Sequence, residues 1–290
     1  TLELLRAAIV QRLGEAALAT LVPDDPRPAA LDDGAWPAVL AARFTPEAAT
    51  SPGLDALHGF LDDGAGALGS NCWAVAKGKS GKPLFAGDPH LAPRNPAVWY
   101  EITLEGAGYK IAGFSFPGLP GIVIGHNDRI AWSFTVAYID TQDLFVEQQD
   151  PTDFRRYLFR GSYERATVVR EEIRVKGKAD PVLVDVTVTR HGPIITPVLK
   201  GQYAQLALRW TALEPLVGLD SLLALNRARD WSTYRAALAT FPGPTVTGCY
   251  ADADGHIGWS HAGVLPVRAK GDGRMPVPGW TGEYEWTGFV

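Results

Sequence analysis

The stretch GSNCWAV, residues 69–75, separates two parts of the chain that differ in character. It places Ser70 directly after a glycine and directly before a run of strand-forming residues. Taken alone, a Gly-Ser pair before a strand is typical of an ordinary turn. Its significance therefore depends on what precedes and follows it.

The part before Ser70 begins with a helical pattern. Leu2, Leu5, Ile9 and Leu13 recur at helical spacing, which predicts one amphipathic helix over residues 1–21. Residues 22–53 are rich in Pro, Asp and Ala and show no period, so we expect a long surface loop or linker. A short helix over 54–61 and the glycine-rich DDGAGALG then lead to Ser70.

The part after Ser70 consists mainly of strand-like runs. ATVVREEIRV and VLVDVTVTR alternate across KGKADP, which predicts an antiparallel hairpin. A second hairpin is expected to turn at Asp254-Gly255. Two helices interrupt the strands, one near 219–229 and one after Asp230 as N-cap. Strands with helices segregated between them predict an α+β fold built on antiparallel sheets.

Composition excludes several classes of function. The formal net charge of -5 and the absence of a basic stripe argue against a nucleic-acid binder. No apolar run approaches the roughly 18–20 residues that cross a bilayer. Cys72 and Cys249 are the only cysteines. The sequence allows one disulfide between them but does not require it, and Cys72 is interpreted as a packing residue. GKSGKP, DADG and GFSFPG fail as a phosphate loop, a calcium loop and a nucleophile elbow.

Further motifs follow Ser70 in a fixed order. They are GDPHL (87–91), NPAVWYE (95–101), GFSFPGLPGIVIGHNDRIAWSFT (113–135), DTQDLFVE (140–147), RHGPII (190–195) and RMPVPG (274–279). Together with GSNCWAV they resemble the penicillin acylase family of N-terminal-nucleophile hydrolases. The resemblance runs almost continuously from Ser70 to Val290 and extends to the helix and linker before it.

The resemblance implies an αββα sandwich of antiparallel sheets and a precursor that cleaves itself between Gly69 and Ser70. Residues 1–69 would be the end of an α-chain-like segment with its linker. Residues 70–290 would be the nucleophile domain, truncated at its C-terminal end. The implied partners are a small-molecule amide and the remaining parts of the same precursor, with no nucleic acid and no membrane span. The family's usual location is the periplasm or the exterior of the cell.

The chemistry implied is amide hydrolysis through an acyl-Ser70 intermediate. The amine freed by cleavage has a reference pKa of about 7.7–8.0 and can act as base to its own hydroxyl. By resemblance, the N–H of Val136 is one oxyanion donor, His90 orients the Ser70 amine, and a second donor lies beyond Val290. We expect residues 1–290 to be inactive by themselves. The alternative is an acylase-like binding or sensor module without turnover.

Two further sites are implied by the resemblance. An acyl pocket would be lined by Leu91, Val123, Ile124, Leu225 and Val246. All five are aliphatic, which favours alkyl acyl groups over phenylacetyl; β-lactam side-chain amides and N-acyl-homoserine lactones are the expected substrates. No cofactor is required for the reaction. A structural Ca²⁺ is implied at Asp140 and Asp143, with the carbonyl of Gln142 and the backbone near Gly273; the alternative is a pair of solvated turn carboxylates.

Overall fold

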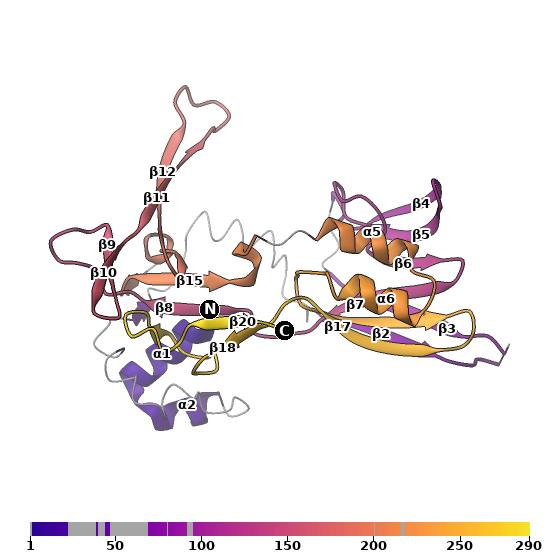
Figure 1. Ribbon diagram of the computed structural model, residues 1–290, viewed down its shortest axis with the longest axis horizontal. Coiled ribbons are helices and arrows are strands. Elements are labelled where there is room, and N and C mark those ends of the chain that lie inside the picture. The colour runs from indigo at the N-terminus through magenta and orange to yellow at the C-terminus, as the bar shows by residue number, and fades with distance from the viewer. Residues whose placement is uncertain are drawn as a thin grey trace. The chain divides into compact units, whose positions relative to one another are not determined.

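The structure, a computed structural model, describes residues 2–22, 39, 44–46, 69–79, 81–91, 95–199, 201–215 and 218–290. It divides into two compact units that interleave along the chain (Figure 1). Unit 1 comprises residues 1–51, 140–213 and 266–290, and unit 2 comprises residues 52–139 and 214–265. The predicted division into residues 1–69 and 70–290 describes where the precursor is expected to be cut, not how the chain packs, and it stays a prediction. Within the described residues no helix is long and apolar enough to cross a membrane.

Unit 2 is built on a six-stranded antiparallel sheet. The strand order is β17-β16-β7-β6-β5-β4. The strands are β4 (Tyr100–Gly106), β5 (Tyr109–Ser115), β6 (Ile124–Asn127), β7 (Ile130–Val136), β16 (Val246–Asp252) and β17 (Ile257–Ala262). Trp132 and Tyr250 form a cross-strand pair on one face of this sheet, and both are fully buried.

Two helices cover that face and two strands cover the other. The helices α5 (Leu219–Arg227) and α6 (Trp231–Leu238) bury Leu225 and Tyr234 against the sheet (Figure 1). On the opposite face, β2 (Gly69–Val75) and β3 (Leu84–His90) pair with each other and pack on β7 and β16. Unit 2 therefore has three layers, one of helices and two of strands.

Local signals explain why several elements of unit 2 begin and end where they do. Asp230 caps α6 by accepting from the N–H of Thr233 at 2.8 Å, as its position before the helix predicts. Gly255 has φ 97° in the turn between β16 and β17, a conformation that glycine adopts without strain. Both hairpins and both helices predicted for the second part of the chain are confirmed.

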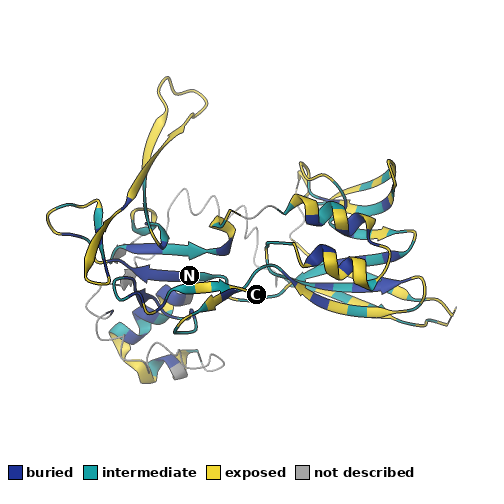
Figure 2. Cartoon of the chain, in the orientation of Figure 1, coloured by how far each residue is buried: buried dark blue, intermediate teal, exposed yellow. Residues whose placement is uncertain are grey.

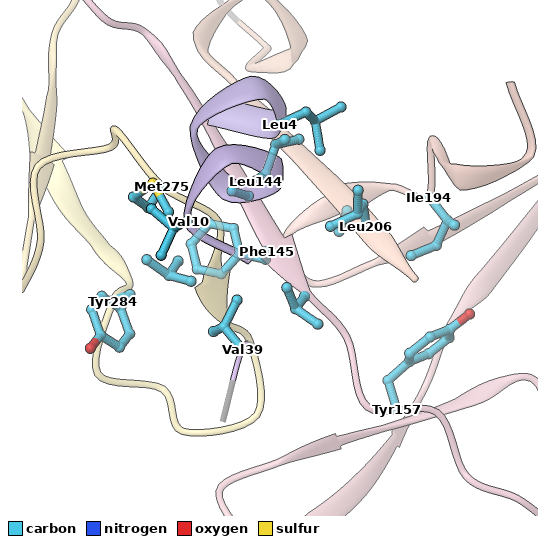
Figure 3. Packing of buried hydrophobic residues seen from close by; sticks show 14 of the residues in the cluster. Leu4, Val10, Val39, Leu144, Phe145, Tyr157, Ile194, Leu206, Met275 and Tyr284 are labelled. Atoms are coloured by element: carbon cyan, nitrogen blue, oxygen red, sulfur yellow. The ribbon is translucent and has the colours of Figure 1, made fainter. Parts of the chain in front are cut away.

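Unit 1 has a small sheet with a helix pair beside it. Its strand order is β15-β8-β19, where β8 (Gln142–Val146) is antiparallel to β15 (Leu206–Trp210) and parallel to β19 (Val277–Pro278). Figure 3 shows Leu144 and Phe145 of β8 among apolar residues from α1 (Leu2–Leu13) and from loops near the C-terminus. The core of unit 1 thus joins segments that are far apart in sequence.

The remaining elements of unit 1 are short pairs. The two-stranded sheets are β1 (Phe44–Pro46) with β14 (Gly201–Tyr203), β9 (Arg156–Phe159) with β10 (Ser162–Arg165), and β18 (Pro266–Arg268) with β20 (Trp286–Phe289). A three-stranded sheet joins β11 (Thr167–Ile173), β12 (Val182–Thr189) and β13 (Gly192–Pro193). The helix α2 (Glu15–Leu21) and the 3-10 turns Thr196–Val198 and Thr211–Leu213 complete the described part of the unit. The β11–β12 hairpin is exposed along most of its length (Figure 2). One of its faces carries Val169, Ile173, Val182, Val184 and Val186.

The single helix predicted over 1–21 is wrong in one respect. Gly14 interrupts it with φ 82°, so the segment forms α1 and α2 instead. Glycine adopts this left-handed conformation at no steric cost, and a helical apolar spacing on both sides hides the break. The predicted helix over 54–61 and most of the predicted linker over 22–53 lie outside the described residues.

Candidate active site

Ser70 is the second residue of β2. It is half-buried, and its Oγ donates to the carbonyl oxygen of Gly69 at 2.6 Å. Ser70 pairs with Pro89 of β3, and Cys72 pairs with Gly87. Because side chains alternate along a strand, Ser70 and Cys72 face the same side, towards β7 and β16. The hydroxyl therefore lies beside the carbonyl of the predicted scissile bond.

The other face of the β2–β3 pair carries a polar cluster. His90 Nε2 is 2.9 Å from Asp88 Oδ2 and 3.2 Å from Asn71 Nδ2. When Nε2 carries the proton and donates to Asp88, it cannot also accept from Asn71 Nδ2, and Nδ1 is the acceptor of the neutral ring. Nδ1 lies on the side of Gly69, 3.7 Å from where a Cβ on that glycine would be. No hydrogen bond among the described residues joins His90 to Ser70.

Val136, the predicted oxyanion donor, is the last residue of β7. It pairs with Val246 of β16, and its side chain is exposed. The next residue, Ala137, donates its N–H to the carbonyl of Thr245 at 3.3 Å. The end of β7 is thus held by its neighbour strand in the same unit that carries Ser70.

A cavity of about 480 Å³ lies between the helices and the sheet of unit 2. Four of the five residues predicted for the acyl pocket line it: Val123, Ile124, Leu225 and Val246. Leu91, the fifth, is 43% exposed just beyond β3 and is not among the lining residues. Ser70 is not among them either.

Aromatic rings also line this cavity, and the sequence did not predict them there. They are Trp99, Phe116, Phe134 and Phe241. Trp99 and Phe116 stack with ring centroids 4.4 Å apart. The preference for alkyl over phenylacetyl groups was argued from the five aliphatic side chains alone and stays a prediction, although this cavity also offers aromatic rings. NPAVWYE and GFSFPG contain two of these rings, but nothing in their spacing indicates that they meet.

Asp140 and Asp143 meet in unit 1, with β8 carrying Gln142 between them. Asp143 is 4% exposed, whereas the Asp140 side chain is 45% exposed, so only Asp143 departs from a solvated turn carboxylate. The Arg268 Nε lies 2.8 Å from Asp143 Oδ2, and Arg268 Nη2 lies 3.3 Å from Asp140 Oδ2. The indole N–H of Trp286 also donates to Asp143. A guanidinium therefore already neutralises one carboxylate.

Three acidic groups, Glu3, Asp140 and Asp143, gather near two cations, Arg268 and Arg6. Burial raises the pKa of Asp140 to about 6, against the effect of Arg268. Burial, and then the charge of Asp143, raise the pKa of Glu3 in α1 well above its usual value. A side chain at Gly273 would overlap both aspartates, so the backbone comes close to them there. This close approach fits a cation, although among the described residues no group of three or more acidic, His or Cys side chains has an arrangement that could hold a metal ion.

His191, within the RHGPII motif, was not predicted to have any role. It is 1% exposed and lies between two carboxylates, with Nδ1 2.8 Å from Glu147 Oε1 and Nε2 2.8 Å from Glu285 Oε1. Burial alone would lower the pKa of His191, but the hydrogen bonds to both glutamates outweigh it and raise that pKa. Its ring stacks on Phe145 at 4.1 Å. No sequence signal pairs these three residues.

Comparison with known proteins gives consistent results. The penicillin amidase family model matches residues 1–290. The chain is 34% identical to acyl-homoserine lactone acylase QuiP of Pseudomonas aeruginosa over 82% of its length, and 34% identical to penicillin G acylase of Escherichia coli over 91%. It covers 30% and 31% of those relatives, so it spans about a third of their length.

A solved structure supports the same assignment. Thermostable penicillin G acylase from Alcaligenes faecalis superposes with a TM-score of 0.68 at 26% identity, over 76% of this chain and 40% of that one. With the antiparallel sheets and few helices described above, this confirms the predicted fold class, an α+β N-terminal-nucleophile hydrolase fold. The chain therefore belongs to the penicillin amidase family.

Proposed function

We propose that the complete protein is an amidohydrolase that cleaves a linear carboxylic amide through an acyl-Ser70 intermediate. The observation that carries the proposal is the position of Ser70: its Oγ lies 2.6 Å from the Gly69 carbonyl oxygen, at the start of a strand that packs against β7. The names of relatives, penicillin acylases and acyl-homoserine lactone acylases, support the same reaction class.

Cleavage between Gly69 and Ser70 would create the catalytic group. The Ser70 hydroxyl attacks the Gly69 carbonyl carbon, the C–N bond breaks, and the acyl group moves to oxygen as an ester. Water then hydrolyses that ester, which leaves a Gly69 carboxylate and a free Ser70 amine. The name of one relative, penicillin acylase 2 proenzyme of Pseudomonas sp., supports a precursor of this kind.

In the mature enzyme the Ser70 amine takes the proton of its own hydroxyl, directly or through one water. The oxygen then attacks the substrate carbonyl, and the Val136 N–H donates to the developing oxyanion. His90, held by Asp88, presents Nδ1 on the side where the new N-terminus begins. The second oxyanion donor belongs to the downstream part of the precursor.

The 480 Å³ cavity supports an apolar acyl group as the specificity element. Both aliphatic side chains and aromatic rings line it, so both alkyl and phenylacetyl groups gain from burial. β-Lactam side-chain amides and N-acyl-homoserine lactones both fit this description. A periplasmic or secreted location follows from the family resemblance alone and is part of the proposal.

We also retain a structural Ca²⁺ at Asp140, Gln142 and Asp143 as a proposal, with no cofactor for the reaction itself. The close approach of the Gly273 backbone to both carboxylates supports it, whereas the contacts of Arg268 with Asp140 and Asp143 oppose it. A bound ion would hold β8 and its flanking turn in unit 1. It would supply no chemistry at Ser70.

Mature N-terminal sequencing of the complete protein tests the central proposal. We expect a chain that begins at Ser70, and an uncut precursor for Ser70→Ala. Ser162→Ala, an exposed serine on β10, is the matched control and should be cut normally. An uncut protein that still hydrolyses amides would overturn the mechanism. An uncut and inactive protein that binds the same amides would instead indicate a binding or sensor module.

A further inference from the structure

Four small residues meet between the two strand layers of unit 2, next to the nucleophile. Cys72 from β2 faces the large sheet, where Cys249 of β16 and Ser133 of β7 form a cross-strand pair on the facing side. Burial, and then the neighbouring Cys249 thiol, raise the pKa of the Cys72 thiol, whereas the buried Ser133 hydroxyl has no hydrogen-bond partner among the described residues. The fourth residue is Gly87 of β3, which pairs with Cys72. Both cysteines are partly buried and unbridged in the structure.

The two layers approach unusually closely at this point. A Cβ added to Gly87 would overlap the side chain of Ser133, so only glycine is accommodated there. A disulfide requires Cα atoms about 4.4–6.8 Å apart, which is shorter than the usual sheet-to-sheet spacing of about 10 Å. The contact of Gly87 with Ser133 shows that the two layers lie closer together than this usual spacing beside the cysteines.

We propose that Cys72 and Cys249 form an intramolecular disulfide that fastens the nucleophile strand β2 to β16. Both S–H bonds are lost and one S–S bond forms. Two electrons and two protons pass to a disulfide oxidant of an oxidising compartment, which is reduced to two thiols.

Burial, together with the neighbouring Cys249, raises the pKa of the Cys72 thiol. The thiolate is the species that reacts, so the folded, reduced pair oxidises slowly. The bond therefore forms while β2 is still docking on the sheet, and it is equally slow to reduce once buried. Such a bond is a fixed structural link rather than a rapid switch.

The position of the bond matters for the site, a point that rests on the proposed function. Cys72 lies two residues after Ser70 on the same face of β2, about 7 Å along the strand. The partner strand β16 also pairs with the end of β7 that carries Val136. The disulfide would thus tie the nucleophile and the proposed oxyanion donor to a common strand, including after cleavage removes the covalent link before Ser70.

The test uses the complete protein exported to an oxidising compartment, unfolded without reductant and treated with a thiol-alkylating reagent. We expect neither cysteine to be alkylated before reduction and both to be alkylated after it, with a mass difference of about 2 Da for the bond itself. Peptide mapping should link the peptides that contain Cys72 and Cys249. Alkylation of both residues in the unreduced sample, or a bond between two chains, would overturn the proposal. None of these readouts depends on amide hydrolysis.

Variants extend the test. Cys249→Ala should leave Cys72 free to react, and Ser133→Ala, the matched control in the same cluster, should keep the bond. Reduction should lower the Tm of the wild-type protein by about 5–10 °C. It should leave the Tm of the Cys72→Ala/Cys249→Ala double variant unchanged; an equal fall in that variant would contradict the assignment.

Discussion

The strand layers of unit 2 beside Ser70 and the core of unit 1 enclose polar groups of different kinds. Between those strand layers the polar side chains are neutral: Ser133 is buried, and Cys72 and Cys249 are partly buried. Unit 1 instead buries charge, with His191 between two glutamates and Arg268 beside Asp143. We infer that changes in the nucleophile layer of unit 2 affect chemistry, whereas changes in the charged clusters of unit 1 affect stability and its dependence on pH.

The largest expected effect is on chemistry in unit 2. Ser70→Ala should abolish cleavage and lower kcat/KM by at least about 10⁴-fold, since a nucleophile has no substitute in an acyl-enzyme mechanism. Its free energy of unfolding should change by less than about 1 kcal/mol, because among the described residues the hydroxyl hydrogen-bonds only to the neighbouring carbonyl. Amide-hydrolysis assays and urea titration measure the two effects. A large decrease in the free energy of unfolding of Ser70→Ala would contradict the inference that changes beside Ser70 affect chemistry rather than stability.

The next effect is on stability in unit 1. His191→Gln removes the cation between Glu147 and Glu285, and we expect a loss of about 3–5 kcal/mol at pH 6. Because the folded pKa of His191 is raised, the stabilisation is complete below about pH 6.5 and is lost as pH rises through that folded pKa. The difference from wild type should therefore shrink in alkaline buffer.

Urea titrations at several pH values test this, with His126→Gln on β6 as an exposed control. The decrease in the free energy of unfolding at acid pH has a separate cause. Burial raises the pKa of Glu285, but its hydrogen bond with His191 outweighs this and lowers it. The contribution of Glu285 is thus present above about pH 4.5 and is lost as pH falls through its folded pKa. Parallel pH profiles for wild type and His191→Gln would contradict this account.

Much of unit 2 could be predicted from the sequence because its signals are local. Strand alternation over GSNCWAV, the cap at Asp230 and the turn at Gly255 each depend on a few neighbouring residues. The burial of His191 could not be predicted, since its partners are 44 and 94 residues away. Four pocket residues came from family resemblance, but the rings opposite them meet only through tertiary packing.

The proposed Ca²⁺ site gives a second test of whether the charged clusters of unit 1 determine stability. Calcium at 100 times its Kd would add about 2.7 kcal/mol to the free energy of unfolding. Asp140→Asn should remove this gain. In EDTA the same variant should be slightly more stable than wild type above pH 6, because the raised folded pKa of Asp140 costs stability as pH rises through about 6.

That second effect should stay below about 1 kcal/mol, since the Asp140 side chain is 45% exposed and its charge is screened. Thermal melting in Ca²⁺ and in EDTA measures both effects. Asp180→Asn, in the exposed hairpin turn of the same unit, is the control. If the Tm of the wild-type protein is the same in Ca²⁺ and in EDTA, no Ca²⁺ ion binds here, and Arg268 is the cation that neutralises these carboxylates.

The last expected effect concerns specificity in unit 2. Each methylene of a fitting acyl chain contributes about 0.8 kcal/mol, so two carbons change kcat/KM by roughly tenfold. Leu225→Trp fills part of the cavity and should lower kcat/KM for decanoyl amides by about tenfold relative to phenylacetyl amides. A series from acetyl to decanoyl, with phenylacetyl, measures this in the processed enzyme.

Leu183→Trp on the exposed hairpin of unit 1 is the control for the bulk of the new side chain. If Leu225→Trp leaves the ratio of kcat/KM for decanoyl and phenylacetyl amides unchanged, this cavity is not the site that binds the acyl group. It would then leave the specificity element to be found elsewhere in the protein.

The β11–β12 hairpin has a practical consequence for handling the protein. Its valine-rich face is solvent-exposed at Val169, Val182 and Val184, and two strands of this kind offer an edge on which other chains can add. Preparations of these 290 residues should be prone to association at high concentration through this arm. Replacing Val184 by Lys places a cation opposite Glu171 on that face without touching either core, which makes it the first substitution to introduce before crystallisation or spectroscopy.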